Sequence, residues 1–150
     1  MRSVYRVLAF VVAAEVVIQA AAIAFAVFGL GKWVEDGGTL NKATMESDDG
    51  SVGGAVGFMI HGINGQMLVP LIALAFLVVS FFAKVPGGVK WAGITFGLVV
   101  LQVLLGVFGH SVPFVGALHG LNALALFGVA VMAGKRVSAP ASAPAEGALV

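Results

Sequence analysis

A histidine followed three residues later by an asparagine occurs twice in the chain, as His61-Gly62-Ile63-Asn64 and as His119-Gly120-Leu121-Asn122. Each copy lies near the start of a long apolar run. An ionisable side chain inside a membrane segment is costly and often marks a functional site. Imidazole nitrogens ligate haem iron, and two histidines at equivalent positions suggest one shared ligand. We therefore expect His61 and His119 to hold a haem iron between them.

The residues around the two histidines fit this expectation. Each asparagine lies on the same helical face as its histidine, where it could orient the imidazole, bond across helices or reach the porphyrin edge. The small residues beside the histidines would let a wide planar ring approach the backbone. Two glutamines at similar depth could bond to the motif residues or to each other. The predicted cofactor-binding residues are His61, His119, Asn64, Asn122, Gly62, Gly120, Gln19 and Gln102.

These residues also have structural interpretations. The asparagines and glutamines can be interhelical hydrogen bonds without any ligand, and the Gly93/Gly97 and Gly116/Gly120 spacings are typical of helix packing. Two histidines are too few for a closed zinc site, which usually has four ligands. Glu15 is the only acid inside a predicted span, and it can mark either a proton path or a polar contact in the bundle interior.

The composition places these residues in a membrane protein. Of the 150 residues 60% are hydrophobic, 10% are charged and none is cysteine. A soluble core of this size could not hide so much apolar surface, so we expect the lipid bilayer to be a direct partner. The absence of cysteine excludes disulfides and thiolate metal sites, and the net charge of +1 gives no indication of nucleic-acid binding.

Four apolar runs are long enough to be spans, since roughly 20 residues cross a bilayer as a helix. They predict membrane helices at about residues 4–30, 55–83, 91–108 and 113–133. Pro70 lies inside the second run, where membrane helices tolerate it with a kink. A signal peptide is the alternative for the first run, but its apolar core is too long for one. Residues 1–136 are thus predicted to form one bundle, followed by a disordered Ala/Pro-rich tail at 137–150.

A second repeat suggests that the bundle consists of two similar hairpins. Val16-Val17-Ile18-Gln19 in the first run recurs as Val99-Val100-Leu101-Gln102 in the third. Both hairpins would enter from the same side, as a parallel repeat about an axis along the membrane normal. Such an axis predicts that His61 and His119 face each other at equal depth.

The distribution of lysine and arginine predicts the orientation. Both termini share a side with the turn at 84–90, and that side carries six cations, against two on the other side: Arg2, Arg6, Lys84, Lys90, Lys135 and Arg136, against Lys32 and Lys42. We therefore expect both termini to be cytoplasmic, in an inner (plasma) membrane of the bacterial type.

Part of the chain resembles one half of haem A synthase, a family of membrane enzymes. The resemblance lies in Leu101-Gln102-Val103-Leu104-Leu105-Gly106-Val107 and, after a short loop, Ala117-Leu118-His119-Gly120-Leu121. Each half of that family is a four-helix bundle with haem-ligating histidines on its second and fourth helices. The resemblance covers four helices, most clearly residues 55–134, and implies His61 and His119 as axial ligands.

The departures from the family concern its catalytic half. That half carries a glutamate three residues before its second-helix histidine and commonly an arginine after it, whereas this chain has Phe58 and Gly62 there. The cysteine pair of some members is also missing. The resemblance is therefore closer to the half that holds haem b without performing the chemistry.

The sequence thus predicts an all-α integral membrane four-helix bundle that binds haem b through His61 and His119. The expected role is electron transfer, haem carriage or redox sensing rather than catalysis, in a homo-oligomer or within a larger respiratory or haem-handling complex. Two alternatives remain open. One is a haem-free structural or assembly subunit of a larger membrane complex, and the other is a small transporter that uses Glu15, Gln19 and the asparagines as a polar path.

Overall fold

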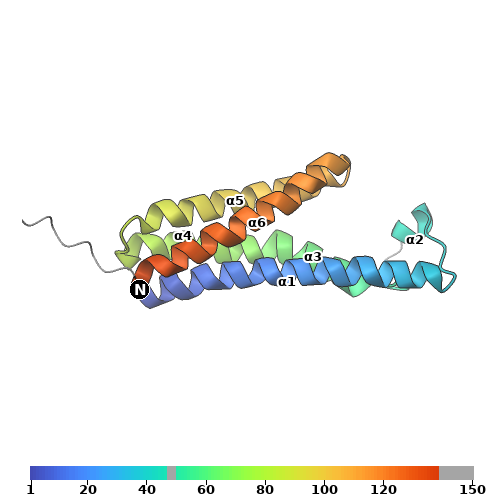
Figure 1. The fold of residues 1–150 in the computed structure, drawn as a ribbon, viewed down its shortest axis with the longest axis horizontal. Coiled ribbons are helices and arrows are strands. Elements are labelled where there is room, and N and C mark those ends of the chain that lie inside the picture. The colour runs from blue at the N-terminus through green and yellow to red at the C-terminus, as the bar shows by residue number, and fades with distance from the viewer. Residues whose placement is uncertain (47–49, 139–150) are drawn as a thin grey trace, which may run out of the picture.

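The chain folds into a bundle of four long helical stretches (Figure 1), and the computed structural model describes residues 1–46 and 50–138. The first, third and fourth stretches are single helices, whereas the second is built from three consecutive segments. In chain order the elements are α1 (Arg2–Glu35), α2 (Lys42–Glu46), α3 (Ala55–Ile63), η1 (Asn64–Leu68), α4 (Val69–Ala83), α5 (Gly88–Gly109), α6 (Pro113–Lys135) and η2 (Arg136–Ser138). The all-α fold expected from the sequence is confirmed.

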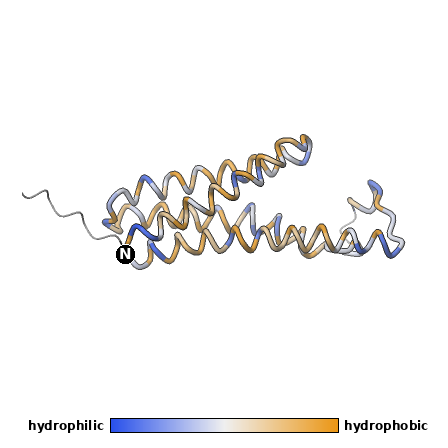
Figure 2. The backbone as a smooth tube through the Cα atoms, viewed as in Figure 1, coloured by the Kyte–Doolittle hydropathy of each residue, from blue (hydrophilic) through white to orange (hydrophobic). Residues whose placement is uncertain are grey.

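All four stretches are long and apolar enough to cross a membrane. Figure 2 shows apolar residues along their length and polar residues concentrated at their ends and around α2. Large apolar side chains point outward from the bundle, among them Phe25 and Phe28, which are 62% and 80% exposed. An apolar outer surface of this extent requires lipid around it. The chain is a multi-pass membrane protein with four spans.

The spans form a closed ring at one end of the molecule. There α1 packs along α4 and α6, and α5 packs along the same two helices, as in an up-down-up-down bundle. The N-terminus, the α4–α5 turn and the end of α6 lie together at this closed end (Figure 1). At the other end, which we call the open end, the α5–α6 hairpin diverges from α1 and α3, and α1 extends beyond it (Figure 1).

Small residues let the helices approach closely at the closed end. Tyr5 is fully buried there; its hydroxyl donates to the carbonyl oxygen of Gly88 at 3.2 Å, and its ring centroid lies 4.7 Å from that of Phe76. The next layer toward the open end contains seven buried apolar residues: Val12, Ala13, Val69, Ala73, Val99, Leu126 and Ala130. These two layers hold the bundle together, and the tightly packed part ends with the second.

The bundle consists of two hairpins, the first formed by α1 with α3, η1 and α4 and the second by α5 with α6. Glycines let the helices of each hairpin approach closely at the level where the two hairpins separate. A Cβ atom on Gly57 of α3 would lie 2.6 Å from the carbonyl oxygen of Ala22 in α1. Near the α5–α6 turn, a Cβ on Gly109 would lie 2.9 Å from Cα of Gly116. The helices of each hairpin are therefore in backbone contact at these points.

The second span contains a π-helical turn, which the sequence did not predict. In η1 the N–H of Val69 bonds to the carbonyl of Asn64, five residues earlier. Pro70 follows directly; it has no N–H to donate, and its ring crowds the carbonyl four residues before it. A widened turn before Pro70 relieves that crowding, so the effect of the proline is a π-helical turn directly after the His61 segment.

The segment expected as a loop between the first two spans is partly helical. The first helix continues to Glu35, and Lys42–Glu46 form the short helix α2. Asn41 and Thr44 cap α2 reciprocally, since the Thr44 N–H donates to Asn41 Oδ1 at 3.0 Å and the Asn41 N–H donates to Thr44 Oγ1 at 2.8 Å. Of the expected tail at 137–150, the first two residues belong to η2, and residues 139–150 lie outside the described residues.

Candidate functional site

His61 and His119 lie opposite each other where the two hairpins begin to separate. His61 comes from α3 and His119 from α6, and their ring centroids are 6.0 Å apart with an angle of 66° between the ring planes. Both side chains are half-buried. His119 lies one turn toward the open end from Asn122, the first buried residue of α6. The structure thus brings together the two histidines that the sequence singled out.

Each histidine ring is held by a backbone carbonyl of the other helix in its own hairpin. Nδ1 of His61 lies 3.2 Å from the carbonyl oxygen of Gln19, and Nδ1 of His119 lies 2.9 Å from that of Gln102. A carbonyl oxygen can only accept a hydrogen bond, so Nδ1 must carry the proton in both rings. In a neutral imidazole the lone pair is then on Nε2, the nitrogen left for a ligand.

The contact between a histidine ring and a glutamine carbonyl is made by equivalent residues in the two hairpins. The glutamines are 83 positions apart (102 − 19) and the histidines are 58 positions apart (119 − 61), which are the offsets of the two sequence repeats. The sequence predicted a role for both glutamine side chains. The interaction common to both hairpins instead uses their backbone carbonyls.

The second hairpin has a continuous side-chain network around its histidine. Gln102 Nε2 donates to the carbonyl oxygen of His119 at 3.0 Å. Asn122 Nδ2 donates to Gln102 Oε1 at 2.6 Å and to the Leu98 carbonyl oxygen at 3.0 Å. Asn122 is 9% exposed, so this network lies in the bundle interior and joins α5 to α6.

The first hairpin has a different arrangement at the matching positions. Asn64 Nδ2 donates to Glu15 Oε2 at 2.8 Å. Within the described residues, both polar atoms of the Gln19 side chain and the Asn64 Oδ1 atom are buried without a hydrogen-bond partner. Glu15 stands at the position that corresponds to Leu98 in the second hairpin, since the offset is again 83 (98 − 15).

The glycines around the site differ in whether a side chain or open space faces them. Gly106 of α5 faces the His119 ring, because a Cβ there would lie 3.1 Å from Cε1 of the ring; the sequence did not single out this residue for the site. Gly65 faces the Gln19 amide in the same way, at 3.0 Å from Oε1. Gly62 and Gly120, which the sequence did single out, have open space where a Cβ would be.

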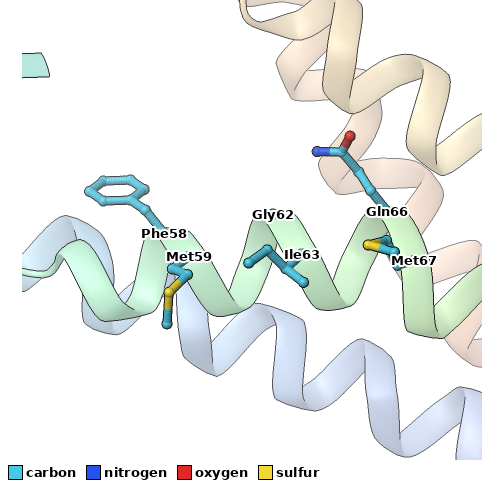
Figure 3. Close-up of a pocket in the computed structure, with 6 residues that line it drawn as sticks. All are labelled: Phe58, Met59, Gly62, Ile63, Gln66 and Met67. Atoms are coloured by element: carbon cyan, nitrogen blue, oxygen red, sulfur yellow. The ribbon is translucent and has the colours of Figure 1, made fainter. Parts of the chain in front are cut away.

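The open space at Gly62 is part of a groove on α3 and η1. Phe58 and Gln66 project from the same side of the helix, one turn before and one turn after Gly62, and leave a gap between them (Figure 3). Met59, Ile63 and Met67 complete the lining. The groove is mostly apolar and borders the helical turn that carries His61.

The polar groups of the site do not form a conventional metal cluster. Within residues 1–46 and 50–138 no three His, Asp or Glu side chains are close enough to hold a metal ion together. The two imidazole rings of His61 and His119 are 6.0 Å apart between their centroids and come from the facing helices α3 and α6. Comparisons with protein-family models, curated proteins and solved structures found no match.

Proposed function

We propose that the chain is a b-type haem protein of the membrane, with His61 and His119 as the two axial ligands. The separation of the two rings is the observation that carries this proposal. Two imidazoles that held one metal ion from opposite sides, each through a nitrogen at about 2 Å, would have ring centroids about 6 Å apart, because each centroid lies about 1 Å behind its nitrogen. The observed separation is 6.0 Å.

The hydrogen bonds of the rings support the same assignment. Metal-ligating histidines usually donate their second ring N–H to a carbonyl or carboxylate, which fixes the tautomer and the ring orientation. Gln19 and Gln102 provide such carbonyls. His61 and His119 would hold the iron through Nε2, and the open space at Gly62 and Gly120 would admit the porphyrin.

Electron transfer is the role that this ligand set favours. A bound haem would supply one-electron chemistry, and its iron would be held by both His61 and His119, which disfavours oxygen activation. The resemblance to the non-catalytic half of haem A synthase points in the same direction. Haem carriage and redox sensing use the same site and require the same two histidines.

An absorption spectrum of the purified protein, with and without added haem, tests the proposal. We expect the Soret and visible bands of a bis-imidazole haem in the wild type. His61→Ala and His119→Ala should each lose them, whereas His110→Ala should keep them, because His110 lies in the exposed α5–α6 turn. A wild type that binds no haem, or two alanine variants with the wild-type spectrum, would overturn the proposal.

A haem-free subunit held together by the histidine and asparagine contacts is the second candidate. The network of Gln102, His119 and Asn122 favours it, because its hydrogen bonds form without any ligand. This candidate predicts a colourless protein that co-purifies with a larger complex. It also predicts that added haem produces no Soret band beyond that of the His61→Ala/His119→Ala double variant.

We further propose that the closed end faces the cytoplasm. The six cations of the predicted cytoplasmic side fall on the segments gathered there, whereas Lys32 and Lys42 lie toward the far end and form i,i+4 ion pairs with Asp36 and Glu46. Because the chain has no cysteine, single cysteines can be introduced at Ser3 and Ser51. A membrane-impermeant thiol reagent applied to intact cells should label only the cysteine at position 51, and labelling at position 3 would reverse the orientation.

A further inference from the structure

The two hairpins differ in charge at one matched position beside the histidine pair. Glu15 of α1 corresponds to Leu98 of α5 in the 83-residue offset that also relates Gln19 to Gln102. Asn122 donates to the backbone of Leu98, whereas Asn64 donates to the side chain of Glu15. The first hairpin thus places an ionisable carboxyl where the second has a neutral peptide group.

Among the residues that the structure describes, no lysine or arginine forms an ion pair with Glu15. Among the described residues, α4 and η1 carry no titratable side chain, and the titratable groups facing this level of α1 are His61 on α3 and His119 on α6. The other charged groups of α1 and α6 lie near the ends of these helices, several helical turns from Glu15. Neither of the ion pairs found within the described part of the chain involves Glu15. Glu15 is half-buried in an apolar span, where charges interact more strongly than in water.

The amide groups beside Glu15 can bind water. Gln19 lies one turn from Glu15 on the same face of α1, and Asn64 lies on the same face of its helix as His61. Gln19 Nε2, Gln19 Oε1 and Asn64 Oδ1 are buried without partners in the described residues. They are one NH2 group with two N–H donors and two acceptor oxygens, and buried water in proteins typically makes about three hydrogen bonds with such groups.

We propose that Glu15 takes up a proton when an electron enters the haem site between His61 and His119. This inference rests on the proposed haem function. The step would need a haem held by His61 and His119: an external one-electron donor would supply the electron, the haem would accept it, and one proton from the aqueous phase would form an O–H bond on the Glu15 carboxyl. The charge added by the electron is thereby compensated within the first hairpin. Leu98 provides no such group in the second hairpin.

The midpoint potential of the haem, measured against pH in the full-length protein, tests this step. Coupling of one proton to one electron lowers the potential by about 59 mV for each tenfold fall in proton concentration. We expect the wild type to approach this slope over part of the pH range. Glu15→Gln, which keeps an acceptor for Asn64, should flatten it. Glu35→Gln, which removes an exposed carboxyl at the far end of α1, should leave it unchanged.

A redox difference infrared spectrum identifies the group that gains the proton. Reduction should produce a carboxylic-acid C=O band in the wild type and in Glu35→Gln, but not in Glu15→Gln. Carboxyl-labelled glutamate should shift this band in the wild type, which separates it from haem propionates without any substitution. A haem-containing wild type whose potential does not vary with pH, or whose band does not shift with the label, overturns the inference and leaves the haem assignment standing. A wild type without a Soret band overturns both.

Discussion

Gln102 and His119 hold each other by two hydrogen bonds of opposite direction. The Gln102 amide donates to the backbone carbonyl of His119, and the His119 ring donates from Nδ1 to the backbone carbonyl of Gln102 at 2.9 Å. In the first hairpin only the ring contact is present, because the Gln19 side chain has no partner among the described residues. The two glutamines therefore occupy equivalent positions with unequal energetic roles.

Replacement of each glutamine by leucine should reveal this inequality. Gln102→Leu removes the side-chain bonds to His119 and Asn122, and we expect it to cost about 1 kcal/mol. Gln19→Leu removes no side-chain hydrogen bond to any described residue and exchanges a buried amide for an apolar group, so it should be neutral or stabilising. Unfolding of the two variants in mixed micelles measures the difference. An equal loss of stability in both would contradict the assigned roles.

The contact of α1 with α3 should depend on the absence of a side chain at Gly57. A Cβ there would lie 2.6 Å from the Ala22 carbonyl oxygen, so Gly57→Ala must push the helices apart and should cost about 1–3 kcal/mol. Gly93→Ala is the matched control, because in the described part of the chain no atom of another helix lies within 4 Å of the added Cβ. The control should be neutral or slightly stabilising, since alanine favours helix. Thermal unfolding in detergent compares the two, and a similar melting temperature for both would refute the close contact.

The π-helical turn before Pro70 should make one deletion tolerable. A π-turn contains one residue more than an α-turn, so removal of the exposed Met67 can convert η1 to α-helix without rotating His61. Deletion of the exposed Leu124 in the regular helix α6 must instead rotate His119 by about 100° relative to the core. We expect the first deletion to keep the Soret band and the second to abolish it. Loss of the band in both, with helicity retained, would show that the π-turn does not absorb the deletion.

The Tyr5 hydroxyl should contribute to stability at the closed end. Tyr5→Phe removes its hydrogen bond to Gly88 and leaves a buried carbonyl, for a loss of about 1 kcal/mol. Tyr5→Ala also empties a fully buried site and should cost about 3–5 kcal/mol. Haem binding at the other end of the packed region should persist in Tyr5→Phe. The two losses can be measured in the same micelle-unfolding experiment, and equal losses would mean that the ring contributes no packing energy.

Apolar run length was sufficient to predict the helical class and the number of spans, because a bilayer admits few other structures. The matched His-x-x-Asn segments likewise indicated that His61 and His119 would meet. The ring partners could not be predicted, because every residue has a backbone carbonyl and only helix packing selects those of Gln19 and Gln102. Gly106 was missed for a similar reason: its contact with His119 depends on the crossing of α5 and α6. The π-turn had a sequence signal in Pro70, but that signal does not distinguish a kink from a widened turn.

The unequal lengths of the helices bear on how the protein fits a bilayer. At 1.5 Å per residue, the 34 residues of α1 measure roughly 50 Å, and the 23 residues of α6 measure roughly 35 Å. A hydrocarbon layer of about 30 Å matches the shorter hairpin, which therefore sets the immersion depth of the molecule. The far end of α1 must then stand clear of the acyl chains, or α1 must tilt strongly, and the hydrophobic mismatch falls on the hairpin that carries Glu15 and His61.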